Sequence, residues 1–284
     1  MSVINPVAKI MKTPYRQPLT DRLPNLKGFS PAIKNIVLTL LIPVVLVIMW
    51  EVLSRKGIIR PSILPAPSTI GLTLLDMLKS GELFRHLGVS ILRVFQGYIL
   101  GASLGIIIGF LMGLFKPVEK AFSLITGLLR PIPIVAWVPV LILWMGIDES
   151  SKITVIAIGS FWPTLLNVIH GIKNTDKKYL EVAEILGKNK FTVLTKVVLP
   201  SALPSIFTGL RLAIGIAWMS VIAAELIAAA SGIGYLIMYA REISQPDVML
   251  VGVLSIGITG LLIDVLIRKI EARLLGWNIN ILGD

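Results

Sequence analysis

Long apolar segments separated by short polar ones dominate the chain. The apolar runs cover roughly residues 35–53, 94–115, 121–147, 153–172, 205–230 and 248–267. About 20 apolar residues are enough for a helix to cross the hydrocarbon core of a bilayer. The second and fourth runs contain no Asp, Glu, Lys or Arg. The pattern therefore predicts an all-α, polytopic membrane protein with six transmembrane helices.

Composition supports the same class of protein. Hydrophobic residues make up 55% of the 284 residues, charged residues only 15%, and the mean hydropathy is +0.85. A typical soluble domain carries about 25% charged residues. The formal net charge of +11 would suggest nucleic acid in a soluble protein, but here the basic residues lie mostly between apolar runs, which indicates membrane surfaces and no nucleic acid. The absence of cysteine excludes disulfides and thiolate chemistry.

Loop charges predict the direction of the spans. If the N-terminus is cytoplasmic, the inner segments hold 17 Lys and Arg and the outer segments hold 7. The positive-inside bias then predicts that both termini are cytoplasmic. The expected location of the protein is the inner or plasma membrane of the cell. The expected organisation is a basic tail over 1–35, a permease domain over 36–270 with a cytoplasmic loop at 173–204, and a C-terminal tail over 271–284. An external segment, 54–92, is expected to include a short surface helix near Thr69–Leu78.

The second run carries a regular glycine series. One glycine recurs every fourth residue, at Gly97, Gly101, Gly105, Gly109 and Gly113. This spacing leaves a shallow groove along one side of a helix, where another membrane helix can approach closely. The series predicts a helix-packing surface and specifies no chemistry.

The loop at 173–204 has a helical pattern of its own. Asp176 is a candidate N-cap, and an apolar stripe follows at Tyr179, Val182, Ala183 and Leu186. Gly187 is expected to turn the chain into a second helical stretch, Asn189–Leu199. The stripe has two possible roles. It packs on the protein's own helix ends or lies at the headgroup region of the bilayer, or it docks into a groove of a partner protein. Periodicity alone leaves both possibilities open.

The same loop resembles a known motif. Glu181-Val182-Ala183, three residues, Gly187, nine residues and then Val197-Val198-Leu199-Pro200 is similar to the EAA loop of ABC importer permeases, with mild departures at Val182 and Val197. The stretches 64–70, 80–101, 128–147, 208–226 and 231–243 resemble the branch for aliphatic sulfonates, taurine and nitrate. The resemblance implies a type I ABC importer transmembrane domain that pairs with a second copy, two ABC ATPase subunits and an external solute-binding protein. It assigns ATPase docking to Tyr179, Glu181, Val182, Ala183, Leu186, Gly187, Leu199 and Pro200.

The energy source is expected to lie outside this chain. There is no G-x-x-x-x-G-K-[ST] phosphate loop, so ATP and Mg²⁺ are expected on the partner ATPases, with no cofactor, metal or catalytic residue here. The implied cargo is a small anion such as an aliphatic sulfonate or taurine, with nitrate or bicarbonate also possible. A stand-alone secondary carrier is the alternative; a membrane enzyme would need a nucleophile or metal cluster that the sequence lacks.

A few residues interrupt the apolar runs and are candidates for the translocation pathway. Arg130, Pro131 and Pro133 break the third run, and they either line a kink that attracts an anion or sit at the interface where a helix starts. Trp137 follows them, as a pathway or packing residue. Glu225 is either a pathway or gate residue, or a carboxylate hydrogen-bonded between helices.

Overall fold

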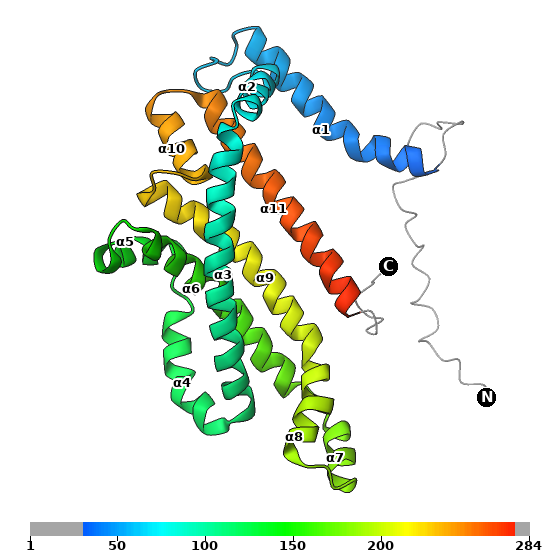
Figure 1. Cartoon of the computed structure of the whole chain (residues 1–284). Coiled ribbons are helices and arrows are strands. Elements are labelled where there is room, and N and C mark those ends of the chain that lie inside the picture. Colours follow the sequence, from blue (N-terminus) through cyan, green and yellow to red (C-terminus); the bar gives the residue numbers. More distant parts are fainter. Residues whose placement is uncertain (1–30, 276–284) are drawn as a thin grey trace, which may run out of the picture. The chain divides into compact units, whose positions relative to one another are not determined.

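The computed structural model describes residues 31–275, and this part of the chain is helical without any strand (Figure 1). The all-α prediction is confirmed. The helices are α1 (Pro31–Arg55), α2 (Pro67–Lys79), α3 (Glu82–Leu114), α4 (Lys116–Leu129), α5 (Ile134–Met145), α6 (Glu149–Lys173), α7 (Lys177–Ile185), α8 (Lys190–Val193), the π-helical turn η3 (Leu194–Val198), α9 (Leu199–Ala228), α10 (Ile233–Glu242) and α11 (Pro246–Leu274).

The chain divides into two compact units, residues 1–50 and 51–284. The described part of the first unit is the body of α1, whose apolar side chains between Leu40 and Met49 are exposed within the chain. In the second unit, the helices α3, α6, α9 and α11 each have the length and hydropathy to cross a membrane, and the α4–α5 pair is one further, bent candidate. These spans agree with a multi-pass membrane protein. The full count of six stays a prediction.

Two helix boundaries differ from those expected. α3 begins at Glu82, twelve residues before the apolar run, because its first turns carry polar residues that are buried inside the protein, among them His86, Ser90 and Arg93. α11 continues to Leu274, past the expected start of the C-terminal tail, because Lys, Arg and Glu are good helix formers. The predicted tails otherwise lie outside the described residues.

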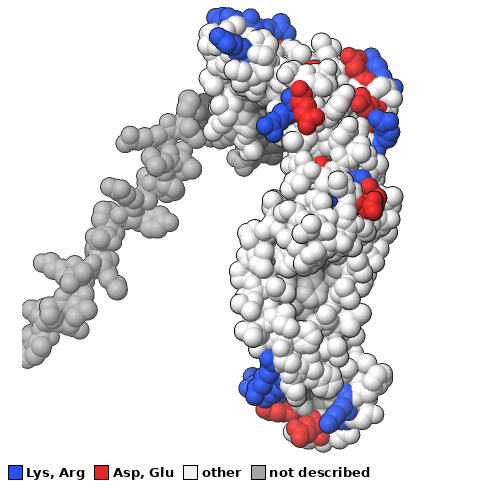
Figure 2. All heavy atoms as spheres, turned by 90° about the vertical axis from the view of Figure 1, so that its left-hand side faces the viewer, with Lys and Arg blue, Asp and Glu red and all other residues white. Residues whose placement is uncertain are grey.

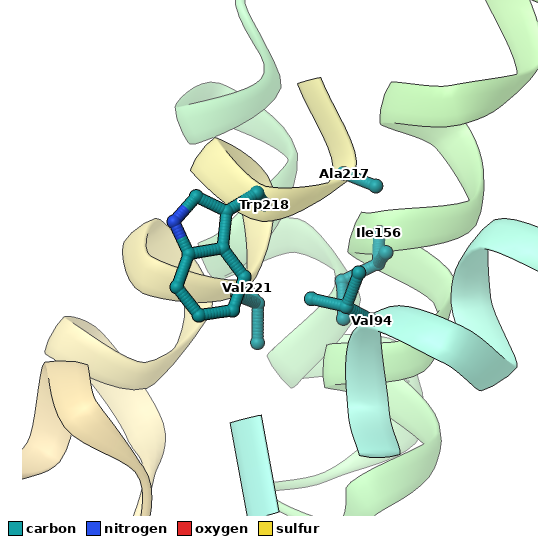
Figure 3. Packing of buried hydrophobic residues seen from close by; sticks show 5 residues of the cluster. All are labelled: Val94, Ile156, Ala217, Trp218 and Val221. Carbon is teal, nitrogen blue, oxygen red and sulfur yellow. The ribbon is translucent and has the colours of Figure 1, made fainter. Parts of the chain in front are cut away.

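The core of the second unit is a set of three long helices. α6 packs against both α3 and α9. At their meeting point Val94 of α3, Ile156 of α6, and Ala217, Trp218 and Val221 of α9 form a buried cluster (Figure 3). Apolar side chains from all three helices are thus packed together at this point.

The predicted glycine series lies along the α3–α6 contact. A Cβ at Gly97 would meet Ile156, one at Gly105 would lie 2.9 Å from the Phe161 carbonyl oxygen, and one at Gly109 would lie 2.8 Å from the Val168 side chain. Gly101 and Gly113 are equally crowded by α6. The groove is therefore filled from within the same chain, and backbone meets backbone along about four helical turns.

Charged residues are spread over the upper part of the face shown in Figure 2 and gather again at its lower end, and a stretch between the two groups carries none. The lower group includes Lys and Arg as well as Asp and Glu, as does the upper one. An uncharged middle flanked by charge is what a bilayer requires of a protein that crosses it.

Candidate functional site

The loop between α6 and α9 folds as the pattern predicts. Asp176 caps α7, its carboxylate accepting a hydrogen bond of 2.9 Å from the Lys178 N–H. At the other end Gly187 has φ +61°, a left-handed conformation that favours glycine. The Lys188 N–H then bonds to the Ala183 carbonyl and the Gly187 N–H to that of Glu184, closing the helix as a Schellman motif does. Both turns are thus specified locally.

An apolar groove of about 440 Å³ separates α7 from the segment that follows it. One wall is formed by Tyr179, Val182 and Leu186, whose side chains are more than half exposed. The opposite wall includes Val193, Val197 and Pro200. Ala183 is buried at the base. We call this hollow the loop groove.

Five of the eight residues expected to dock a partner line the loop groove, and three do not. Gly187 lies in the turn that follows α7. Glu181 is exposed on another face of α7, and Leu199 packs into the cluster around Val198 and Ala202 at the base of the loop. Sequence periodicity missed two apolar side chains outside the stripe, Ile185 and Phe191, which are 84% and 73% exposed.

The second half of the loop continues into the following span, α9, as helical backbone without a break. The second stretch begins at the N-cap Asn189, whose side chain accepts from the Thr192 N–H at 2.7 Å. From there α8, η3 and α9 succeed one another without an intervening loop residue. Pro200 lies in the first turn of α9, directly after the π-helical turn η3.

The third apolar run is broken at the predicted place. α4 ends at Leu129, α5 starts at Ile134, and the two axes meet at 97°. Arg130 and Pro131 are exposed in the break, and Pro133 is the N-cap residue of α5. Pro133 thus starts a helix here, which is one of the two alternatives given above. The other alternative also keeps support, because Arg130 lines a cavity of about 470 Å³ between α3, α4 and α6.

Glu225 is enclosed in a polar network near the end of α9. Its side chain is 0% exposed and accepts from Arg93 Nη1 at 2.8 Å and from the Ser90 hydroxyl at 2.8 Å. The Gly234 N–H donates to the second carboxylate oxygen at 2.9 Å. This is the arrangement in which Glu225 is hydrogen-bonded between helices, and it leaves the carboxylate no open face toward a pathway.

The network fastens the start of α10 to α3. Arg93 also donates to the Ser231 carbonyl at 2.7 Å and forms a two-point contact with Glu149, at 2.6 Å through each nitrogen. The Gly232 N–H donates to His86 Nδ1 and the Ile233 N–H to Ser90 Oγ. We call these groups the α3–α10 clamp. Removing one partner of a buried ion pair costs about 3–5 kcal/mol, so the clamp is a strong constraint on α10.

Sequence reasoning missed Arg93 as a charge buried inside the protein. The apolar run was delimited at Val94, and the polar side chains before it were assigned to an external loop. A signal was present, because His86, Ser90 and Arg93 follow one another at i, i+4 and i+7 and so share one face of a helix.

A set of long apolar helices, an uncharged middle and a protruding helical loop together define a membrane-spanning protein. Comparison with known proteins supplies the family. Residues 83–276 match the model of the "binding-protein-dependent transport system inner membrane component", and the chain belongs to this family of ABC importer permeases.

Individual relatives point to one branch of the family. The chain is 42% identical over 239 residues to SsuC of Bacillus subtilis (strain 168), named for aliphatic sulfonate transport, covering 84% of this chain and 87% of that protein. It is 33% identical over 258 residues to the taurine transport system permease protein TauC of Escherichia coli (strain K12), covering 89% and 94%. A solved amino acid ABC transporter shares the fold, with a TM-score of 0.60 at 18% identity over 70% of this chain and 98% of that one. The suspected family and branch are confirmed.

Proposed function

We propose that this permease carries a small organic anion, an aliphatic sulfonate or taurine, inward across the cell membrane as a two-fold homodimer. Two ATPase subunits would bind ATP and Mg²⁺ on its cytoplasmic side, and a solute-binding protein would deliver the anion outside. The names of SsuC and TauC, at 42% and 33% identity, support the substrate class. Both termini would lie in the cytoplasm, in keeping with the charge bias of the loops.

The observation that carries the partner assignment is the loop groove. Tyr179, Val182 and Leu186 are exposed on a helix that protrudes past the core, and an apolar stripe in water is a site for a partner. Arg130 is proposed to line the pathway, because it lies beside a cavity between three helices. Trp137 joins it, since its side chain lines the neighbouring cavity.

Reconstitution tests the transport assignment. Permease and ATPases in proteoliposomes, with the binding protein and radiolabelled butanesulfonate or taurine, should show ATP-dependent uptake. Permease without ATPases should show none. Uptake by the permease alone under an ion gradient would instead establish a secondary carrier. Native mass spectrometry of the permease should give two copies; a monomer in the transporting complex would contradict the homodimer.

A matched pair of variants tests the docking role of the loop. Gly187→Val should weaken co-purification of the ATPase, because a branched side chain at φ +61° distorts the turn beside the groove. Gly57→Val is the control, since Gly57 has φ +70° and equally open surroundings but lies outside this loop. Both variants carry similar backbone strain. Equal loss of ATPase from both would show that strain alone, and not the loop, is responsible.

A further inference from the structure

Two adjoining cavities lie where α4 stands beside α3 and α6, an arrangement that can be followed in Figure 1. No side chain of α4 is buried, so this helix leaves space on its inner side. The first cavity, which we call the arginine cavity, has a volume of about 470 Å³ and includes Arg130. The second, the apolar cavity, has a volume of about 400 Å³ and is also bordered by α5. Both fall in the size range of small-molecule sites.

The arginine cavity presents one uncompensated positive charge. It contains a single carboxylate, Glu119, which is already paired with Lys173 of α6. Arg130 has no ion-pair partner within 4.0 Å in the part of the chain that the structure describes, and it is exposed to the cavity. A guanidinium offers parallel N–H donors to a planar or tetrahedral oxyanion. The cavity therefore suits the head of an anion.

The apolar cavity has almost no polar lining. Its walls are aliphatic and aromatic side chains from four helices, among them Leu104, Ile125, Trp137 and Phe161. Thr126 lines both cavities, and the successive residues Leu129 and Arg130 line one each. The Thr126 hydroxyl is turned back to the Ser123 carbonyl at 3.0 Å, so it adds little polarity. The two cavities thus adjoin each other at the last turn of α4, where they share Thr126.

We propose that the two cavities form one bipartite site for an alkanesulfonate, with the sulfonate at Arg130 and the alkyl chain in the apolar cavity. The proposal rests on the proposed transport of organic anions and narrows its substrate class. Taurine is disfavoured here, because its ammonium group would be buried in the apolar cavity without a partner. An inorganic anion is disfavoured too, since it leaves the apolar cavity unused.

The proposal gives a quantitative expectation. Each methylene that enters an apolar environment gains about 0.8 kcal/mol, which corresponds to about a fourfold gain in affinity. Affinity should therefore rise about fourfold per methylene from methanesulfonate to butanesulfonate, until the chain fills the cavity. Removing the guanidinium should lower affinity by a similar factor at every chain length, because it acts on the head group alone.

Equilibrium dialysis of the purified permease–ATPase complex in nanodiscs, without binding protein, measures this directly with radiolabelled alkanesulfonates. Ile125→Trp fills the apolar cavity and should flatten the chain-length dependence. Leu124→Trp is the matched control: it adds the same bulk to the adjacent residue, which is 70% exposed and lines neither cavity, and should keep the slope. Arg130→Gln should weaken all members and keep the slope.

Several results would overturn the bipartite site. These are a wild-type affinity that does not depend on chain length, or a slope that survives Ile125→Trp. A 1-alkanol that binds as tightly as the sulfonate of the same chain length would also overturn it, because the head group would then contribute nothing and the cavity would be a slot for lipid chains. Proteoliposome uptake distinguishes failure of the bipartite site from failure of the proposed substrate class. Sulfonate uptake without a chain-length slope removes this site alone, whereas no sulfonate uptake with any binding protein removes the proposed substrate class.

Discussion

The contact between α3 and α6 allows a sharp test of how the core is held together. At Gly101 an added Cβ would lie 2.8 Å from the Ala157 carbonyl carbon, and it would be closer still to the carbonyl oxygen and to Ser160 Oγ. Carbon atoms in ordinary contact are about 3.5–4.0 Å apart, so Gly101→Ala forces the two helices about 1 Å apart. Overpacking of this kind costs about 1–3 kcal/mol.

Gly88→Ala is the control on the same helix. Nothing lies within 4 Å of a Cβ built at Gly88, so alanine there meets open space. Replacing a helical glycine by alanine then stabilises the helix by about 0.5–1 kcal/mol. The two variants make the same chemical change in α3, and the expected effects have opposite signs.

Thermal or denaturant unfolding of the purified permease in detergent measures the difference. Gly101→Ala should lower the unfolding midpoint, and Gly88→Ala should leave it unchanged or raise it. Ser160→Ala in the Gly101→Ala background removes one of the two overlaps and should restore only part of the loss, because the Ala157 carbonyl stays in place. A Gly101→Ala variant as stable as Gly88→Ala would refute close backbone packing as the reason for the glycine series.

Two further variants test the clamp and the loop. Glu225→Ala should lower the free energy of unfolding by about 3–5 kcal/mol, because it removes the buried partner of Arg93 and leaves only Glu149, whose side chain is 58% exposed. Glu149→Ala should cost about 1 kcal/mol or less. Equal losses in denaturant titrations would contradict a buried clamp. Asp176→Ala should destabilise α7 by about 1 kcal/mol through loss of its N-cap, and it should weaken ATPase co-purification. Asp176→Asn should preserve the stability of α7 and the co-purification, because asparagine is also a good N-cap residue. Identical behaviour of the Ala and Asn variants would show that the cap is not needed.

Much of the fold can be predicted from the sequence, because a helix that crosses a bilayer needs about 20 apolar residues in a row. Apolar runs located α3, α6, α9 and α11, and the spacing of the glycines located a packing face. Asp176 and Gly187 act on their own turns, so local pattern was enough for the loop.

The features that the sequence did not reveal depend on contacts between distant residues. Arg93 and Glu225 are 132 residues apart, and only tertiary packing brings them together. Hydropathy treats an embedded arginine as a reason to end a span, because it cannot register the carboxylate that compensates it. The cavities beside α4 were hidden for a similar reason: they are formed by residues of three or four helices and have no sequence period of their own.

The uninterrupted passage from α8 through η3 into α9 makes this part of the chain a lever. Residues 190–228 have a length of about 58 Å at about 1.5 Å per residue, nearly twice the ~30 Å thickness of the hydrocarbon core. If a force on the loop tilts this rod by about 5°, its two ends shift by about 5 Å relative to each other. Glu225 lies near the far end and is fastened through Arg93 to α3 and through Gly234 to α10. A movement of the loop on one side of the membrane would therefore be transmitted to α3 and α10 on the opposite side, while the hydrogen bonds that join them to Glu225 stay intact.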